Sequence, residues 1–381
     1  MAKKVLEVGG RQLKFDDSIY VIENKHGKAI ISTIVDDMPT MYSGGTAMKA
    51  FLHESFNDFF ETTCDDPLTS VFGLEVTRYR DQRTLKLQQR GSQNNLFNKY
   101  IPTWETDDID TFAKIPWKPN GPISAKDLAL QQIPLNAKEI KNFQSMVGEL
   151  NWCTITAPDF IYGIKMSSRR QTSKKNPPNQ LDIKNAMQTI SCMAGIVRKD
   201  KDGLIIGGTT IDLTFTTDTS YHGMEDLKSC TGGTIHLNPS TGSIVSTCEK
   251  HKITTDSAMA AEGVGSHLHI RKIIPILYLF EELGLAMDHP ASFYMDNIPF
   301  MQTIIGNKGL SGKSKHILIR LQMTKEAFDS KQIGLKHLRT ENMVSDILTK
   351  ALAFEQWDHL RDPLLGRCPI KLNDENDNLL T

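Results

Sequence analysis

Four acidic residues in the second half of the chain lie in local contexts that could build one site. Asp218 ends an apolar, strand-like run, and Asp296 ends a second one. Glu262 follows the first residues of a long helical pattern, and Asp346 follows those of a shorter one. Strand ends and helix starts can meet at one edge of a sheet, which would bring the four carboxylates together. Carboxylates clustered in this way hold two hard cations roughly 4 Å apart in two-metal phosphodiester chemistry.

Each of these acids also has an ordinary structural explanation. An Asp at a strand end is usually a turn or cap residue, and an acidic residue in the first turn of a helix, such as Asp346, is favoured by the helix dipole. Glu262 is harder to explain in this way, because its neighbours are apolar and a carboxylate beside a core-facing stripe usually needs a partner or a metal. The order of strand end, helix start, strand end and helix start favours a joint site.

The composition is typical of a soluble protein of a reducing compartment. The 381 residues are 39% apolar and 23% charged, which allows two or three domains. No run of 18 apolar residues occurs, and the N-terminus lacks the apolar core of a signal peptide. The six cysteines include no Cys-x-x-Cys pair, which disfavours a zinc ribbon or a disulfide framework. We therefore expect a cytoplasmic or nuclear protein without a membrane span.

Basic residues are clustered although the formal net charge is only −1. Nine Lys or Arg and two Asp between residues 165 and 201 give a local charge of +7, and residues 307–320 contain four basic residues and no acid. Such clusters suit a nucleic-acid backbone, while two solvated helix faces are the alternative. The residues expected to contact nucleic acid are Arg169, Arg170, Lys174, Lys175, Lys308, Lys313, Lys315, His316 and Arg320. His316 and Arg320 could also serve only in packing.

The first half of the chain is expected to be α+β. Alternating apolar residues predict a hairpin at 19–35 and another at 70–88, with a helix at 46–62 between them. Residues 104–137 are rich in Pro and Asp, which predicts an extended connector. Helices are expected at about 138–170 and 180–199, because the Pro-Pro pair between them cannot lie inside a helix.

The second half is expected to be α/β and to begin after Lys201-Asp-Gly203. Three strands joined by turns are followed by a long helix that stops at Gly284, and then by alternating strands and helices. This order predicts a mixed sheet with helices packed on it. The expected strands are Leu204–Asp218, Gly233–Asn238, Ser243–Lys252, 291–296 and 333–339, and the expected helices are Ser257–Leu283, 298–305, 313–330 and 342–352.

Several short motifs between residues 213 and 352 match those of one known family. Ser345-Asp-Ile-Leu-Thr-Lys-Ala-Leu352 matches Ala-Asp-Ile-Leu-Thr-Lys-Pro-Leu, and Lys315-His-Ile-Leu-Ile-Arg320 matches Lys-His-Ile-Asp-Ile-Arg. Tyr294-Met-Asp-Asn297 matches Tyr-Cys-Asp-Asn, and Thr217-Asp-Thr-Ser-Tyr221 matches Ser-Asp-Ala-Asp-Trp. The region therefore resembles the ribonuclease H domain of copia-type retrotransposon polyproteins, which implies a ribonuclease H-like mixed sheet with flanking helices.

The same resemblance assigns the helical carboxylate. Counting back without a gap from Glu281-Glu-Leu-Gly284 places Glu262 on the metal-binding glutamate of the family's Ser-Thr-Glu-Ala-Glu-Tyr motif. Three neighbours depart from the family pattern: Ser220 replaces an Asp, Ala260 a Glu, and Gly263 a Tyr. The resemblance implies that all four metal carboxylates are retained, namely Asp218, Glu262, Asp296 and Asp346.

The first half carries a second resemblance. Ile34-Val-Asp-Asp37 closes a hairpin strand and resembles the Tyr-Val-Asp-Asp palm motif of reverse transcriptases. Phe72-Gly-Leu-Glu-Val76 resembles the family's Phe-Leu-Gly-Ile-Glu-Val, and Ser145-Met-Val-Gly-Glu-Leu-Asn-Trp152 its Ser-Leu-Val-Gly-Ser-Leu-Met-Tyr. The implied domains are a partial palm (1–100), a connector with a helical thumb or connection (101–202), a ribonuclease H-like domain (203–352) and a disordered C-terminal tail (353–381).

The polymerase motif lacks one carboxylate. In the family, a third acid lies in a segment upstream of the hairpin. We expect this chain to start after that segment. Asp36 and Asp37 alone cannot hold the two metals of nucleotide addition. We therefore expect the pair to be a relic of a polymerase site.

The resemblance implies a fragment of reverse transcriptase and ribonuclease H that hydrolyses the RNA strand of RNA–DNA hybrids with two Mg²⁺ ions, Mn²⁺ being a substitute. The expected partners are the hybrid and a polypeptide that supplies the missing polymerase segment. The main alternative is a protein that keeps the fold and binds nucleic acid or protein without cutting. The two are distinguished by cleavage of a labelled hybrid.

Overall fold

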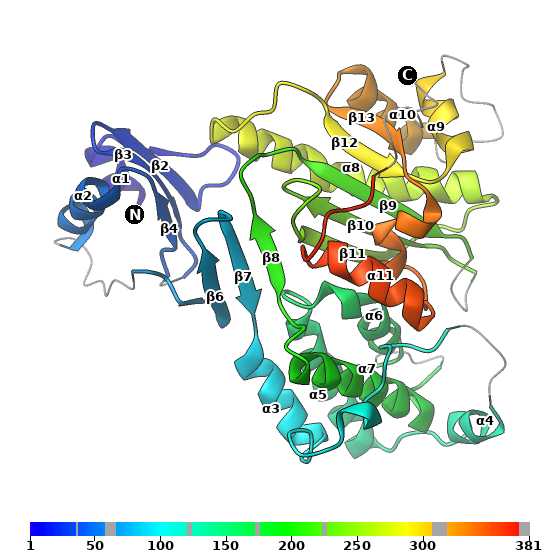
Figure 1. Ribbon diagram of the computed structural model, residues 1–381. Coiled ribbons are helices and arrows are strands. Elements are labelled where there is room, and N and C mark those ends of the chain that lie inside the picture. The colour runs from blue at the N-terminus through cyan, green and yellow to red at the C-terminus, as the bar shows by residue number, and fades with distance from the viewer. Residues whose placement is uncertain are drawn as a thin grey trace. The chain divides into compact units, whose positions relative to one another are not determined.

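The structure is a computed structural model, and it describes residues 1–35, 37–57, 66–119, 124–171, 176–222, 227–306 and 318–372. The described chain forms two compact units (Figure 1). Unit 1 contains Met1–Thr77 and Arg271–Asp288, and unit 2 contains Arg78–Ile270 and His289–Thr381. Among the described residues, no helix is both long and apolar enough to cross a membrane. The predicted domain boundaries and the predicted assignment of segments to polymerase parts stay predictions.

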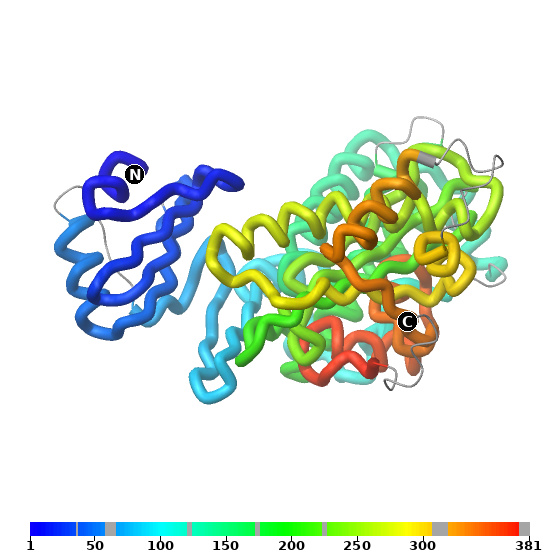
Figure 2. The backbone as a smooth tube through the Cα atoms, turned by 90° about the horizontal axis from the view of Figure 1, so that it is seen from above, coloured from blue at the N-terminus to red at the C-terminus, as the bar shows by residue number. Residues whose placement is uncertain are grey.

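Unit 1 is built on an antiparallel sheet of order β1-β2-β3-β4, of which Figure 1 labels the last three strands. The blue part of the backbone in Figure 2 follows the chain through these strands. The hairpin predicted at 19–35 is confirmed, since β2 and β3 pair from Ile19↔Ser32 to Asn24↔Gly27. The elements of the unit are α1 (Ala2–Glu7), β1 (Arg11–Gln12), β2 (Ile19–Asn24), β3 (Gly27–Ser32), β4 (Thr40–Tyr42), α2 (Gly45–Asn57), β5 (Ser70–Val71) and most of β6 (Leu74–Tyr79).

Alternation along β2 explains how this sheet is covered on two faces. Tyr20 and Ile22 belong to a buried cluster with Met48 of α2, while Val21 packs with Leu283 on the other face. Successive strand residues point to opposite faces, so a run of three apolar residues needs a cover on both sides. The helix that supplies Leu279 to this second cluster is the distal part of α8 (Ala258–Glu282).

The first part of unit 2 is mainly helical. Helices α5 and α7 each begin with a capping box, formed by Asn136 with Glu139 and by Asn179 with Asp182. Helices α5, α6 and α7 pack on one another (Figure 1). The elements are β7 (Thr84–Gln88), α3 (Arg90–Tyr100), η1 (Ile109–Thr111), α4 (Ala125–Gln131), α5 (Ala137–Cys153), η2 (Pro158–Phe160), α6 (Ile161–Arg170), α7 (Gln180–Arg198) and β8 (Leu204–Gly207).

The second part of unit 2 contains the mixed sheet that the sequence predicts. Its order is β11-β10-β9-β12-β13; β9, β10 and β11 are antiparallel, whereas β12 lies parallel to both β9 and β13. Its elements are β9 (Thr214–Ser220), β10 (Cys230–His236), β11 (Ser243–Lys250), the first half of α8, β12 (Ala291–Met295), α9 (Ile298–Ile305), α10 (Leu318–Asp329), β13 (Ile333–His337), η4 (Thr340–Asn342), η5 (Val344–Leu348) and α11 (Phe354–Leu364).

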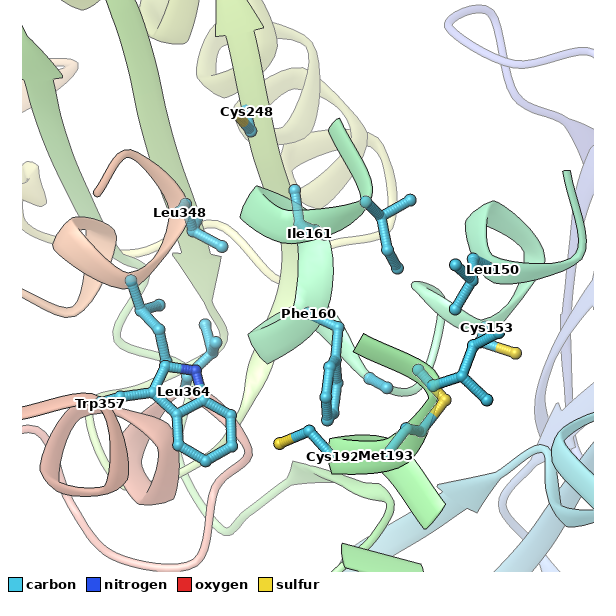
Figure 3. Packing of buried hydrophobic residues seen from close by; sticks show 14 of the residues in the cluster. Leu150, Cys153, Phe160, Ile161, Cys192, Met193, Cys248, Leu348, Trp357 and Leu364 are labelled. Carbon is cyan, nitrogen blue, oxygen red and sulfur yellow. The ribbon is translucent and has the colours of Figure 1, made fainter. Parts of the chain in front are cut away.

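One apolar cluster joins the helical part of unit 2 to this sheet. Figure 3 shows Phe160 beside Trp357 and Cys192, and the Phe160 and Trp357 rings meet edge to face with centroids 6.0 Å apart. Arg361, which lies 5.5 Å from the centre of the Trp357 ring, forms an ion pair of 2.6 Å with Asp159 in which each side chain is only 1% exposed. The cluster fixes α11 against η2, and so holds the C-terminal part of the unit in place.

Two predicted elements end differently in the structure because of local backbone geometry. The strand expected from Leu204 to Asp218 is two strands, since Gly207 and Gly208 have φ of +114° and break it; β8 pairs with β7 outside the mixed sheet. The helix expected at 138–170 is interrupted: α5 ends at Cys153, and a new helical turn begins at Pro158. A proline disfavours the α conformation of the residue before it, here Ala157.

Three further expectations are also wrong. The helix expected at 342–352 is two short 3-10 turns, η4 and η5, separated by Met343 in an extended conformation. The connector expected at 104–137 contains η1 and α4. The tail expected to be disordered from residue 353 contains α11, whose Trp357, Leu360 and Leu364 recur at helical spacing and are buried.

Candidate metal centre

Three of the four predicted carboxylates converge in unit 2. Asp218 lies within β9, Glu262 in the second turn of α8, and Asp296 directly after β12. One oxygen of each lies within 4.8 Å of the others, and within the described residues this is the group of three or more ligand side chains that could share a metal ion. Asp218 and Glu262 are 3% and 5% exposed, so their charges are largely removed from water.

Strand register explains why Asp296 lies beside Asp218. The parallel pairing of β12 with β9 matches Ser292 with Thr214 and Tyr294 with Thr216. Two residues further along, the same register brings Asp296 level with Asp218. The sequence predicted Asp218 at a strand end, whereas it lies two residues before the end of β9, within the paired part of the strand.

Glycines let the other two acidic segments approach the sheet. A Cβ on Gly265 would lie 2.3 Å from Oγ1 of Thr219, so α8 can reach β9 only because this residue has no side chain. A Cβ on Gly232 would lie 2.7 Å from the carbonyl oxygen of Ser345, which is next to Asp346. Gly263, the departure from the family pattern, has a comparable role, since its Cβ would lie 2.5 Å from Leu321 of α10.

Asp346 is connected to this group through a lysine. Nζ of Lys350 lies 3.0 Å from Oδ1 of Asp346 and 3.3 Å from Oδ1 of Asp218. Asp346 is buried in η5, although it does not belong to the group whose oxygens all lie within 4.8 Å. The structure therefore brings three predicted ligands together directly. The fourth, Asp346, is linked to Asp218 by the ammonium group of Lys350.

Burial and mutual repulsion raise the pKa of three of these acids. Desolvation is the largest cause for Glu262, followed by the charges of Asp218 and Asp296, while hydrogen bonds from Thr219 act in the opposite direction on its pKa. Desolvation and then Asp218 raise the pKa of Asp296. The same two causes raise the pKa of Asp346 to about 8. These carboxyl groups therefore retain protons more readily than free ones unless positive charge is added.

Hydroxyl groups and a lysine that sequence reasoning did not assign complete the centre. Thr349 donates a hydrogen bond to Oδ2 of Asp218, and Thr340 donates one of 2.9 Å to Oδ2 of Asp296. Although burial opposes its charged form, Asp218 and Asp346 raise the pKa of Lys350 well above its ordinary value. Thr349 and Lys350 lie inside the motif 345–352, so the motif itself carries the signal for both residues.

The donor set fits a hard divalent cation. It consists of carboxylate oxygens, which Mg²⁺ and Mn²⁺ prefer, and contains no thiolate or imidazole. One ammonium, that of Lys350, is paired with two of the four acids, and after burial the charges of neighbouring acids contribute to the raised pKa values of Glu262 and Asp296. A cation bound among Asp218, Glu262 and Asp296 would relieve this repulsion.

The predicted nucleic-acid contacts are only partly described. Lys174, Lys175, Lys308, Lys313, Lys315 and His316 lie outside the described residues. Arg170 lies 3.6 Å from Oδ1 of Asp182, and Arg169 donates to Sγ of Cys230 at 3.6 Å, so both have contacts within the fold. Arg320 lies in the first turn of α10 and is half-buried. The role of all nine in nucleic-acid binding stays a prediction.

Of the two acids that the sequence predicts to be a polymerase relic, Asp37 lies in unit 1. Asp37 is exposed and forms an isolated bridge with Ile34, in which each backbone N–H donates to the other residue's carbonyl at 3.0 Å. Asp36 lies outside the described residues. The structure thus shows a tight acidic turn at Asp37, whose assignment as a relic stays a prediction.

Comparisons with known proteins agree with the motifs. The chain is 25% identical over 355 residues to the retrovirus-related Pol polyprotein from transposon RE2 of Arabidopsis thaliana, and 24% identical over 357 residues to that from transposon RE1 of the same plant. Each match covers 92% of this chain and 22% of the relative, so the chain spans about a fifth of the length of the curated relatives that it matches. No protein-family model matches it. The motifs and these two matches agree: the chain is similar to retrovirus-related Pol polyproteins of transposons.

Proposed function

We propose that unit 2 contains a copia-type, ribonuclease H-like domain that hydrolyses the RNA strand of RNA–DNA hybrids. The observation that carries the proposal is the convergence of Asp218, Glu262 and Asp296 within 4.8 Å, on the elements where the resemblance expects metal ligands. The mixed sheet with flanking helices also supports a ribonuclease H-like fold.

The four acids would hold the metal ions. Asp218, Glu262 and Asp296 would bind as one group, and Asp346, which is paired with Lys350, would be the fourth ligand. When bound, Mg²⁺ activates the attacking water and stabilises the leaving 3′-oxygen in hydrolysis of this type. The chain itself orients the ligands: Thr349 and Thr340 each fix one oxygen of an aspartate, and the second oxygen of Asp218 accepts from Lys350. Lys350 compensates part of the charge of Asp218 and Asp346.

The substrate is proposed from the chemistry of the site and the charge of the chain. Carboxylates with hard cations act on phosphodiesters, and the basic segments 165–201 and 307–320 would contact the backbone of the hybrid. Such duplexes are recognised by shape and by 2′-hydroxyl groups rather than by base sequence. Cleavage should therefore depend little on the sequence of the hybrid.

The proposal is tested by incubating the purified chain with a hybrid whose RNA strand carries a 5′ label, in the presence of Mg²⁺. We expect RNA fragments with the wild-type chain, none after chelation, and none with Asp296→Asn. The Asp37→Asn variant is the matched control, because it removes one exposed carboxylate of unit 1. Absence of wild-type cleavage, or equal cleavage by Asp296→Asn, would favour the alternative of a binding protein without activity.

Primer extension on an RNA template tests the polymerase half. We propose that this chain alone does not extend a primer, because one of the two carboxylates of its palm-like motif, Asp37, lies exposed in a tight turn with no described three-carboxylate group around it. Extension that appears only when a second polypeptide is added would support, as partner, a polypeptide that supplies further polymerase residues.

A further inference from the structure

A buried chain of hydrogen bonds leads away from Glu262 through the sheet. Glu262 is hydrogen-bonded to Thr219. The hydroxyl of Thr219 lies 2.9 Å from that of Thr231, which lies 2.7 Å from Nε2 of His251. The chain thus runs from α8 across β9 and β10 to the residue after β11, and His251 is 1% exposed.

The far end of the chain fixes the position of the imidazole proton. Burial, followed by the charge of Arg320, lowers the pKa of His251 to about 4, so the ring is neutral near pH 7. Its Nδ1 is buried and forms no hydrogen bond with the described residues. A neutral imidazole carries one N–H, and a buried donor without an acceptor is costly. The proton therefore belongs on Nε2, where it is donated to Thr231.

The direction of the remaining bonds follows from the number of protons. Each threonine hydroxyl has a single proton to donate. If Thr231 accepts from His251, its own proton is free to be donated to Thr219, and the proton of Thr219 is then donated to Glu262. All three bonds consequently point toward the carboxylate, as an ionised metal ligand requires.

We infer that His251 is a positioning residue for Glu262, acting through Thr231 and Thr219 to hold this carboxylate in the orientation that binds a divalent cation. The inference rests on the proposed function of Glu262 as a metal ligand. Hydrogen-bond partners of this kind typically change metal affinity about 10–100-fold when they are removed.

The same strands contain a natural control with the opposite polarity. The hydroxyls of Thr216 and Thr234 lie 2.7 Å apart, and that of Thr234 lies 3.0 Å from Nε2 of His236. Nδ1 of His236 donates to the carbonyl of Thr241 at 2.8 Å, and burial lowers the pKa of His236 to about 4. Its neutral ring therefore accepts at Nε2. This second Thr-Thr-His chain does not involve the predicted metal ligands.

The first test is nitrogen NMR of the histidines in the whole, metal-free chain. We expect the proton of His251 on Nε2 and that of His236 on Nδ1, so that the two buried rings give opposite patterns in one spectrum. A proton on Nδ1 of His251, or a doubly protonated ring at pH 7, would overturn the inference. This measurement needs no substitution and no activity.

The second test measures Mn²⁺ affinity by calorimetry. Thr231→Val should weaken binding about 10–100-fold, Thr231→Ser should restore it, and Thr234→Val should leave it unchanged. Equal affinities for Thr231→Val and Thr234→Val, with both variants folded, would overturn the inference. If these variants behave as expected but the wild-type chain does not cleave a hybrid, the hydrolytic proposal fails while the positioning role stands.

Discussion

The two acidic regions of this chain differ in environment rather than in residue type. The carboxylates of unit 2 are largely buried, repel one another and accept hydrogen bonds from Thr219, Thr340 and Thr349. Asp37 of unit 1 is exposed at a tight turn. Water stabilises an exposed charge, whereas a buried carboxylate needs hydrogen bonds, an ion pair or a metal ion to remain charged. The difference favours unit 2 as the functional site.

The largest expected contrast between the two regions is in hybrid cleavage. Asp218→Asn keeps the shape of the side chain but removes its charge. This charge acts on each of the other three acids, Glu262, Asp296 and Asp346. We expect cleavage to fall at least about 100-fold, more than for the loss of an indirect ligand partner. Asp37→Asn should stay within about twofold of the wild type. Initial cleavage rates are measured on one hybrid preparation. An equal loss of activity in both variants would contradict the assignment of the functional site to unit 2.

The pH dependence of stability should also separate the two regions. The folded-state pKa of Asp346 is raised to about 8, and those of Glu262 and Asp296 are raised as well. The folded, metal-free chain therefore keeps protons that the unfolded chain loses above about pH 4, so stability falls as pH rises from about 4 to about 8. Each such proton contributes about 1.4 kcal/mol per pH unit within that window.

Denaturant unfolding at pH 5 and pH 8 in a chelating buffer measures this loss. Asp346→Asn should reduce it, whereas Asp37→Asn should leave it unchanged. Saturating Mg²⁺ should oppose the loss, because a cation that binds only the folded chain stabilises it. Stability that rises with pH in the metal-free wild type would contradict the raised pKa values.

A smaller effect is expected from Lys350→Met, which removes the ammonium between Asp218 and Asp346 while keeping most of the apolar length of the side chain. At pH 8 without metal, we expect a loss of about 1–2 kcal/mol, less than for a fully buried pair because Lys350 is 35% exposed. Lys118→Met, which breaks a 3.6 Å pair with Asp127 in which the lysine is 59% exposed, is the control and should lose less. A loss no larger than that of the control would show that Lys350 does not stabilise the centre.

Local patterns predicted the elements of the site, but not the contacts between them. Asp296 after β12, the long helix α8 and its end near Gly284 follow from periodicity and turn chemistry, which are local. The close approach at Gly232 and Gly265 depends on which strand passes which helix. No local pattern shows that a glycine faces Ser345 or Thr219 rather than solvent.

The same limit explains the errors at the C-terminal end. The strongly polar last residues of the chain favour a disordered tail, whereas Trp357, Leu360 and Leu364 recur at helical spacing and form one side of α11. The ion pair of Arg361 with Asp159 joins residues 202 positions apart, so it could not be foreseen from either segment. Long-range pairing of this kind becomes visible only in the folded chain.

The most direct test of the account is Mg²⁺ or Mn²⁺ titration of the wild type, Asp296→Asn and Asp37→Asn by calorimetry under identical conditions. The account predicts saturable binding to the wild type, at least about 10-fold weaker binding to Asp296→Asn, and wild-type binding to Asp37→Asn. Equal binding by all three chains, or no saturable binding by the wild type, would contradict the claim that the buried carboxylates of unit 2 are a metal centre.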